Sequence, residues 1–174
     1  MSIVFIHIPK TAGRTISTAL RCVCEESNNY LDLKHRHRPA IYIKNNIFRD
    51  DVKWDKSYKI TFIRNPWQRA VSLWKYTYNR KFYRKTNIIE TKINQNMIDD
   101  FKYWLLTDSN QKINNKTVSK FNKRFWGKYP KTDILNHVNP LSALSWISDL
   151  NGNILVDFIG RFEHIDGDFS KINK

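Results

Sequence analysis

The hydrophobic and polar positions near the start of the chain predict a strand, a loop and a helix in succession. Residues 3–8 form an apolar run that ends at Pro9 and is followed by Gly13, which is typical of a buried strand that enters a tight loop. After Thr15 the apolar positions recur at the spacing of one buried helical stripe: Ile16, Leu20, Val23 and Cys24. The first unit is therefore predicted to be a strand, a loop and a helix.

A second unit repeats this pattern about fifty residues later. Residues 58–63 read as an apolar strand, Asn65-Pro66 breaks it, and aromatic and apolar residues then align on one helical face: Trp67, Val71, Trp74 and Tyr78. Two such units predict a parallel α/β sheet. Because ligands of such sheets bind beyond the carboxyl ends of the strands, both loops are expected to open onto one crevice.

The rest of the chain is predicted to add helices and one hairpin. A short helix is expected from about Pro39, and a further helix carries apolar residues on one face: Met97, Phe101, Trp104 and Leu105. Near the end, Asn151-Gly152 supplies a turn between residues 143–147 and 154–159, which predicts an antiparallel hairpin. The fold class expected is α/β, with a small central parallel sheet flanked by helices and a C-terminal hairpin.

The length of the chain bounds the number of domains, and its charge indicates the kind of partner. A chain of 174 residues is long enough for one domain with a core, so residues 1–174 are expected to form a single domain. The net charge is +14, and residues 80–131 hold 13 Lys and Arg against 4 Asp and Glu. This basic region predicts an anionic partner, and nucleic acid, anionic polysaccharide, acidic lipid headgroups and nucleotides all fit the charge.

The location expected from the sequence is the cytoplasm. No apolar run approaches the roughly 20 residues that span a bilayer, and Met1 comes directly before the first strand, where a signal peptide would need room. A soluble protein without a transmembrane segment is therefore expected.

The first loop, residues 9–15, has the composition of a phosphate or sulfate site. It places Lys10, hydroxyl groups and backbone N–H groups at a helix N-terminus, where the dipole and the unpaired donors favour an anion. The spacing Gly-x4-Gly-Lys-Ser/Thr of nucleoside-triphosphatases is absent, and the Lys precedes the Gly.

The second loop, residues 64–66, offers a second anion site. Arg64 leaves the predicted strand and Ser72 lies eight residues further on, within the next helix, so a guanidinium and a hydroxyl can reach one phosphate. Two such loops at the ends of adjacent parallel strands predict a ligand with two separated phosphate groups.

Three segments in this order resemble the motifs of one known family. Residues 5–16 resemble the 5′-phosphosulfate loop of the sulfotransferase superfamily, residues 62–73 resemble its 3′-phosphate segment, and residues 157–163 resemble a motif that follows its acceptor-side region. The chain is most similar to the carbohydrate sulfotransferases and their bacterial relatives. The resemblance implies a P-loop-kinase-like fold of three layers.

The resemblance also implies a donor and residues that bind it. The donor is 3′-phosphoadenosine 5′-phosphosulfate, and its product is adenosine 3′,5′-bisphosphate. Lys10 would stabilise the charge on the leaving phosphate, and Arg64 and Ser72 would bind the 3′-phosphate. The remaining residues of the first loop would surround the 5′-phosphosulfate: Thr11, Ala12, Gly13, Arg14 and Thr15. Sulfuryl transfer needs in-line positioning and charge neutralisation, so no metal is expected.

A general base is expected between the two loops, because related carbohydrate sulfotransferases use a His from that segment. Residues 34–40 contain two, of which His37 resembles the family's base best and His35 is the alternative. Glu163 is left open as a base, as a ligand of the nucleotide, or as the partner of Arg161 or another cation. His7 is expected to be a structural residue of the core.

Two alternatives to the enzyme remain open from the residues. One is a basic nucleic-acid-binding protein in which Lys and Arg contact phosphates without catalysis. The other is a nucleotide kinase, against which the missing Gly-Lys-Ser/Thr pattern argues. With a sulfotransferase, the acceptor is expected to be a hydroxyl of a glycan, anionic if it docks on the basic region, and nucleic acid is not an expected partner.

Overall fold

The chain forms two compact units in a computed structural model that describes residues 2–24, 30–31, 37–86, 93–103, 105 and 142–172. The first unit comprises Met1–Pro66 and Lys131–Lys174, and the second comprises Trp67–Pro130. The first unit carries a sheet, whereas the described part of the second is helical. The single domain expected over residues 1–174 stays a prediction.

The sheet of the first unit is parallel, as predicted. Its strand order is β2-β1-β3-β4, and every neighbouring pair runs in parallel. The strands are β1 (Ile3–Ile6), β2 (Tyr30–Leu31), β3 (Tyr58–Ile63) and β4 (Phe158–Arg161). The two strands predicted from the apolar runs, β1 and β3, are therefore confirmed, and they pair directly.

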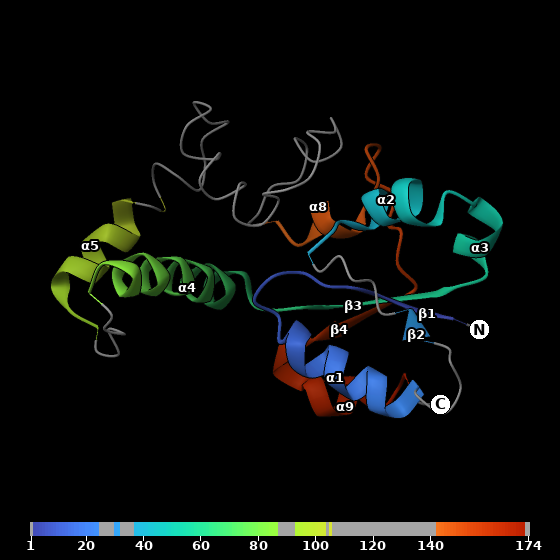
Figure 1. Cartoon of the computed structure of the whole chain (residues 1–174), viewed down its shortest axis with the longest axis horizontal. Helices are drawn as coiled ribbons and strands as arrows, with labels where there is room; N and C mark the ends of the chain where they lie inside the picture. The colour runs from blue at the N-terminus through green and yellow to red at the C-terminus, as the bar shows by residue number, and fades with distance from the viewer. Residues whose placement is uncertain are drawn as a thin grey trace. The chain divides into compact units, whose positions relative to one another are not determined.

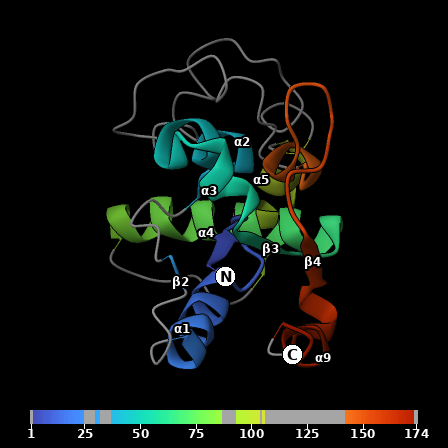
Figure 2. The same ribbon diagram turned by 90° about the vertical axis from the view of Figure 1, so that its right-hand side faces the viewer.

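Helices cover both faces of this sheet, which gives the three layers that the family resemblance implies (Figures 1 and 2). On one face lie α1 (Gly13–Cys24) and α9 (Ile165–Phe169). On the other face lie α2 (Ala40–Tyr42), α3 (Asp51–Asp55) and α8 (Leu144–Ile147). A π-helical turn, η1 (Ile43–Phe48), continues α2, so the short helix predicted from about Pro39 is confirmed.

The core between the sheet and α1 follows from strand alternation. Successive residues of a strand point to opposite faces, and the register places Phe5 beside Ile60. These two side chains and Phe62 pack against Ile16 and Leu20 of α1, and all five are buried. Ile16 and Leu20 of the predicted stripe therefore face the sheet, whereas Val23 is 48% exposed, so its predicted burial is wrong.

On the opposite face, a buried Lys joins the sheet to α3. The Nζ atom of Lys59 lies 3.0 Å from the Asp157 carboxylate and 5.6 Å from the ring centre of Trp54. Trp54 is the buried residue of α3. Lys59 is tolerated in the interior because its charge is paired and its ammonium lies over an aromatic ring.

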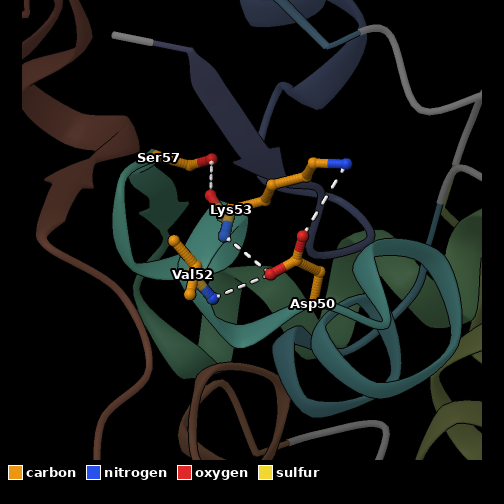
Figure 3. A network of polar contacts seen from close by, with 4 residues as sticks. All are labelled: Asp50, Val52, Lys53 and Ser57. Atoms are coloured by element: carbon orange, nitrogen blue, oxygen red, sulfur yellow. Dashed lines mark hydrogen bonds and ion pairs between the residues drawn. The ribbon is translucent and has the colours of Figure 1, made fainter.

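Helix α3 begins with a side-chain cap (Figure 3). Asp50 Oδ1 accepts hydrogen bonds from the N–H groups of Val52 at 3.0 Å and Lys53 at 3.2 Å. The second oxygen of Asp50 lies 3.7 Å from the Lys53 ammonium, and the Ser57 hydroxyl donates to the Lys53 carbonyl at the other end of the helix. A carboxylate at this position satisfies N–H groups that the helix itself leaves unpaired.

The predicted C-terminal hairpin is wrong, although its turn exists. Asp149 Oδ1 accepts from the N–H groups of Asn151 and Asn153, and Ser148 and Ile154 form an isolated antiparallel bridge. However, the segment before the turn is the helix α8, and the segment after it is β4, which pairs with β3 in parallel. Trp146 and Ile147 of α8 are buried, whereas Leu150 in the turn and Ile154 after it are exposed, so the two segments do not share one buried face.

The second unit contains α4 (Pro66–Thr86) and α5 (Gln95–Tyr103), and both were predicted. Trp74 of α4 contacts Phe101 of α5 edge to face, with ring centres 5.3 Å apart, and Met97 is buried. Within the part of the chain that the structure describes, no helix is long and apolar enough to cross a membrane.

The buried stripe of α4 differs from the predicted one. Trp67 is 73% exposed, so the prediction that it belongs to the core is wrong. Trp74 is buried as predicted, but Val71 is 43% exposed, and the other buried side chains among those described in this helix are Arg69, Ala70 and Leu73. Burial lowers the pKa of Arg69 to about 10, so its guanidinium still carries its charge at neutral pH.

Candidate functional site

The two predicted anion loops leave the sheet at the same edge. β1 and β3 are adjacent and parallel, so their carboxyl ends lie side by side. The first loop follows β1 and leads into α1, and the second loop follows β3. Both loops therefore leave the sheet at the same edge, and the crevice expected there stays a prediction.

The first loop has an unusual backbone that its own side chains hold in place. Lys10 and Ala12 have φ angles of 68° and 61°, a left-handed conformation that costs a non-glycine residue about 1–2 kcal/mol. The hydroxyl of Thr11, a fully buried residue, donates to the Ile8 carbonyl at 2.9 Å. Left-handed residues of this kind are typical of loops whose N–H groups converge on an anion.

The start of α1 contributes further donors. The Ile16 N–H donates to the Ala12 carbonyl, so the N–H groups of Gly13, Arg14 and Thr15 belong to the first turn, which leaves such groups without an intrahelical partner. No acidic residue occupies this turn, and the side chains of Arg14 and Thr15 are exposed. An anion at this helix end would meet the positive end of the helix dipole.

Gly13 is required by a neighbouring imidazole. A Cβ atom added at Gly13 would collide with the ring of His7, which is only 7% exposed and stacks on Phe5 at 5.6 Å between ring centres. The expected burial of His7 is confirmed. Its ring fills the space between the end of β1 and the start of α1, so the first turn of α1 can approach the strand only without a side chain at position 13.

His37 lies against this same group. Its ring centre is 4.2 Å from that of His7, with the rings tilted by 54°, and its Nδ1 lies 3.3 Å from the His7 carbonyl oxygen. Because a carbonyl can only accept, this hydrogen bond requires the proton on Nδ1. In the neutral ring Nε2 is then the nitrogen that can take up a proton. The backbone at His37 is left-handed, with a φ angle of 63°.

The juxtaposition of His7 and His37 was not predicted. His37 was singled out as a base and His7 as a core residue, but thirty positions separate them and no spacing pattern joins them. One signal was available, because His7 directly follows β1 and so lies at the edge where the ligand is expected. His35, the alternative base, lies outside the described residues.

The second loop is held by residues that follow β4. The guanidinium carbon of Arg64 lies 4.3 Å from the ring centre of Phe162, and the Asn65 N–H donates to Glu163 Oε1 at 2.7 Å. The hydrogen bond from Asn65 lowers the pKa of Glu163, and the positive charges of Arg64 and His164 act in the same direction. This hydrogen bond to the second loop is not among the roles left open for Glu163, and those roles stay predictions.

Ser72 lies in α4, in the second unit, and is half-buried. The prediction that Ser72 and Arg64 bind the same phosphate involves both units and stays a prediction.

Among the described residues, no group of three or more His, Cys, Asp or Glu could hold a metal ion.

The fold and these loops define a class of protein. A parallel sheet with a strand, an anion-type loop and a helix N-terminus at its carboxyl edge is the arrangement typical of α/β proteins that bind phosphate or sulfate groups. A family model described as the sulfotransferase family matches residues 1–174, and the chain therefore belongs to this family. No curated protein and no solved structure matches the chain.

Proposed function

We propose that this protein transfers the sulfuryl group of 3′-phosphoadenosine 5′-phosphosulfate to a hydroxyl group of a carbohydrate. Family membership supports sulfuryl transfer in general. The nucleotide donor is supported by two anion loops at one edge of the sheet, since this donor carries phosphate at both its 5′ and 3′ positions.

The observation that carries the proposal is the position of His37. A residue singled out as a base for its place between the two loops lies against His7, whose ring packs on Gly13 of the first loop. A base for sulfuryl transfer must lie near the sulfate, and the sulfate must lie near the first loop. The contacts of His37 with His7 and of His7 with Gly13 support this role, because they bring His37 close to the first loop.

In the proposed reaction His37 acts as the base, and Lys10 and the first loop bind the leaving phosphate. His37 Nε2 takes the proton of the acceptor hydroxyl as its oxygen bonds to sulfur. Lys10 neutralises the negative charge on the phosphate oxygen as its bond to sulfur breaks, and adenosine 3′,5′-bisphosphate leaves. The N–H groups of residues 12–15 bind the 5′-phosphate, while the Thr11 hydroxyl keeps the loop in shape.

Arg64 and Ser72 are proposed to bind the 3′-phosphate, Arg64 as a charged donor fixed over the ring of Phe162.

The acceptor is proposed to be an anionic glycan, because residues 80–131 carry a net charge of +9. Sulfation of neutral and uronate-containing glycans compared at two salt concentrations tests this. Equal, salt-independent rates on both glycans would contradict an anionic acceptor.

Nucleotide binding tests the donor directly. Thermal unfolding is measured with adenosine 3′,5′-bisphosphate, adenosine monophosphate, ATP and a short DNA duplex, each at matched ionic strength. The proposal predicts the largest rise in Tm with the bisphosphate, and a smaller rise in Arg64→Ala. Equal stabilisation by every polyanion would favour a basic nucleic-acid binder, and preference for ATP would favour a nucleotide kinase.

A further inference from the structure

The third family motif, residues 157–163, lies beside the second loop because of strand register. β3 and β4 pair in parallel with Ile63 opposite Arg161, the last residue of each strand. The residues that follow therefore leave the sheet side by side: Arg64 beside Phe162, and Asn65 beside Glu163. Both contacts described above follow this order.

The earlier residues of the motif fix that register. The Asp157 carboxylate accepts the Lys59 N–H at 2.7 Å and pairs with the Lys59 ammonium, which ties the start of β4 to the start of β3. A Cβ atom at Gly160 would collide with the ring of Phe62, its neighbour in β3. A side chain at position 160 would thus displace the Phe62 ring from its place in the core.

Phe162 and Glu163 act on different parts of the second loop. The Phe162 ring lies under the Arg64 guanidinium, which restricts where that charge can lie. Glu163 binds the backbone N–H of Asn65, the residue between Arg64 and Pro66, and so restricts the peptide that carries the Arg64 side chain. Glu163 is exposed and its carboxylate repels a nearby phosphate, so its contribution is geometric rather than electrostatic.

We infer that Phe162 and Glu163 are positioning residues that hold Arg64 in place for the 3′-phosphate, and so determine the preference for a 3′-phosphorylated nucleotide. This inference rests on the proposed function, because it assigns the 3′-phosphate to Arg64. It gives the third motif a role in donor selectivity.

The test is the ratio of two dissociation constants, measured by calorimetry for adenosine 3′,5′-bisphosphate and adenosine monophosphate, which differ only in the 3′-phosphate. Glu163→Ala is expected to reduce the preference for the bisphosphate about three- to tenfold, which corresponds to part of the free energy of one hydrogen bond to a charged group. Phe162→Leu is expected to reduce it about two- to fivefold. Binding of the monophosphate should not change in either variant.

Two further variants separate positioning from charge and from general damage. Glu163→Gln keeps an oxygen that accepts from Asn65 and removes the repulsive charge, so its preference should equal or exceed that of the unchanged protein. Asp168→Ala is the matched control, because Asp168 accepts the Arg161 N–H at 2.8 Å in the same segment without touching the second loop. Its preference should be unchanged.

The outcomes distinguish this inference from the proposed function. If the unchanged protein binds both nucleotides equally, the 3′-phosphate site is wrong and the inference fails with it. If the unchanged protein prefers the bisphosphate and both Glu163→Ala and Phe162→Leu keep that preference, only the inference is overturned. Should Glu163→Ala fail to fold, Phe162→Leu with Glu163→Gln decides in the same way.

Discussion

At the scale of single residues, the site depends on side chains that fix an unfavourable backbone. Three non-glycine residues around the first loop, Lys10, Ala12 and His37, have left-handed φ angles. Each costs free energy that the surrounding contacts must offset, among them the Thr11 hydrogen bond and the packing of the two imidazoles. Residues held in strained backbone conformations often lie at functional sites, so these three residues at one edge of the sheet favour a functional site there.

Replacement of His37 tests the proposed base. His37→Ala is expected to lower kcat for sulfuryl transfer about 10²- to 10⁴-fold, because no positioned group then takes the hydroxyl proton. Binding of adenosine 3′,5′-bisphosphate should change little. Steady-state kinetics and calorimetry on the same preparation check both. Full activity in His37→Ala would remove it as the base.

Replacement of Gly13 tests the packing of His7 against α1. Gly13→Ala is expected to lower the free energy of unfolding by about 1–3 kcal/mol, because the new methyl group meets the His7 ring. The double variant with His7→Ala should recover part of this loss relative to His7→Ala alone. Urea denaturation measures all four proteins.

Gly167 supplies the control for this pair. It lies in α9, and a Cβ atom there would meet nothing within 4 Å. Gly167→Ala should therefore be neutral or stabilise the protein by up to about 1 kcal/mol. If Gly13→Ala behaves like Gly167→Ala, the close contact with His7 is not present in solution.

At the scale of elements, the apolar runs predicted where strands and helices lie. They predicted less well which strands pair and which face of a helix is buried. β1, β3 and α1 follow from local patterns because each buries one face against the same core. The hairpin was wrong because pairing of β4 with β3 depends on contacts such as that of Asp157 with Lys59, 98 positions apart. The stripe of α4 was misplaced because a buried cation, Arg69, interrupts its apolar pattern.

The cap of α3 gives a prediction at this scale. Asp50→Ala removes the acceptor of two N–H groups and is expected to lower the free energy of unfolding by about 1 kcal/mol. Asp55→Ala, an exposed carboxylate at the other end of the same helix, should change it by less than about 0.5 kcal/mol. Urea denaturation compares the two, and equal losses would contradict a specific cap.

The dependence of stability on pH tests the hydrogen bonds of Glu163 and Asp168, in the segment that follows β4. Hydrogen bonds from Asn65 and Lys171 lower the pKa values of Glu163 and Asp168 in the folded protein. A carboxyl with a lowered folded pKa stabilises the protein above its ordinary pKa of about 4, and this stabilisation is lost as the pH falls through the folded pKa. The free energy of unfolding should therefore decrease below about pH 4.5.

The double variant Glu163→Gln with Asp168→Asn shows whether these two groups cause that decrease. Neither amide titrates, so the loss of stability between pH 5 and pH 3 should be smaller than in the unchanged protein. Urea denaturation at several pH values measures it. Identical pH dependence in the two proteins would place the acid sensitivity elsewhere.

At the scale of the whole molecule, the sequence was enough to predict a parallel α/β sheet and the position of the two loops at one edge of it. Order along the chain sufficed for that, because parallel strands bring their carboxyl ends together. The contacts of His7 with His37 and of Glu163 with Asn65 were not predicted, because they join residues 30 and 98 positions apart. The second depends on the register between β3 and β4, which local patterns do not give. His35 and most of the basic region lie outside the described residues.

Sulfuryl transfer itself is measured with radiolabelled sulfate, from 3′-phosphoadenosine 5′-phosphosulfate to a panel of glycans with a chelator present. We expect a labelled glycan and an equal amount of adenosine 3′,5′-bisphosphate. We also expect losses of about 10²- to 10³-fold in Lys10→Ala and about 10²- to 10⁴-fold in His37→Ala. Transfer that both variants retain in full, or folded protein that labels no hydroxyl acceptor, would contradict the proposed function.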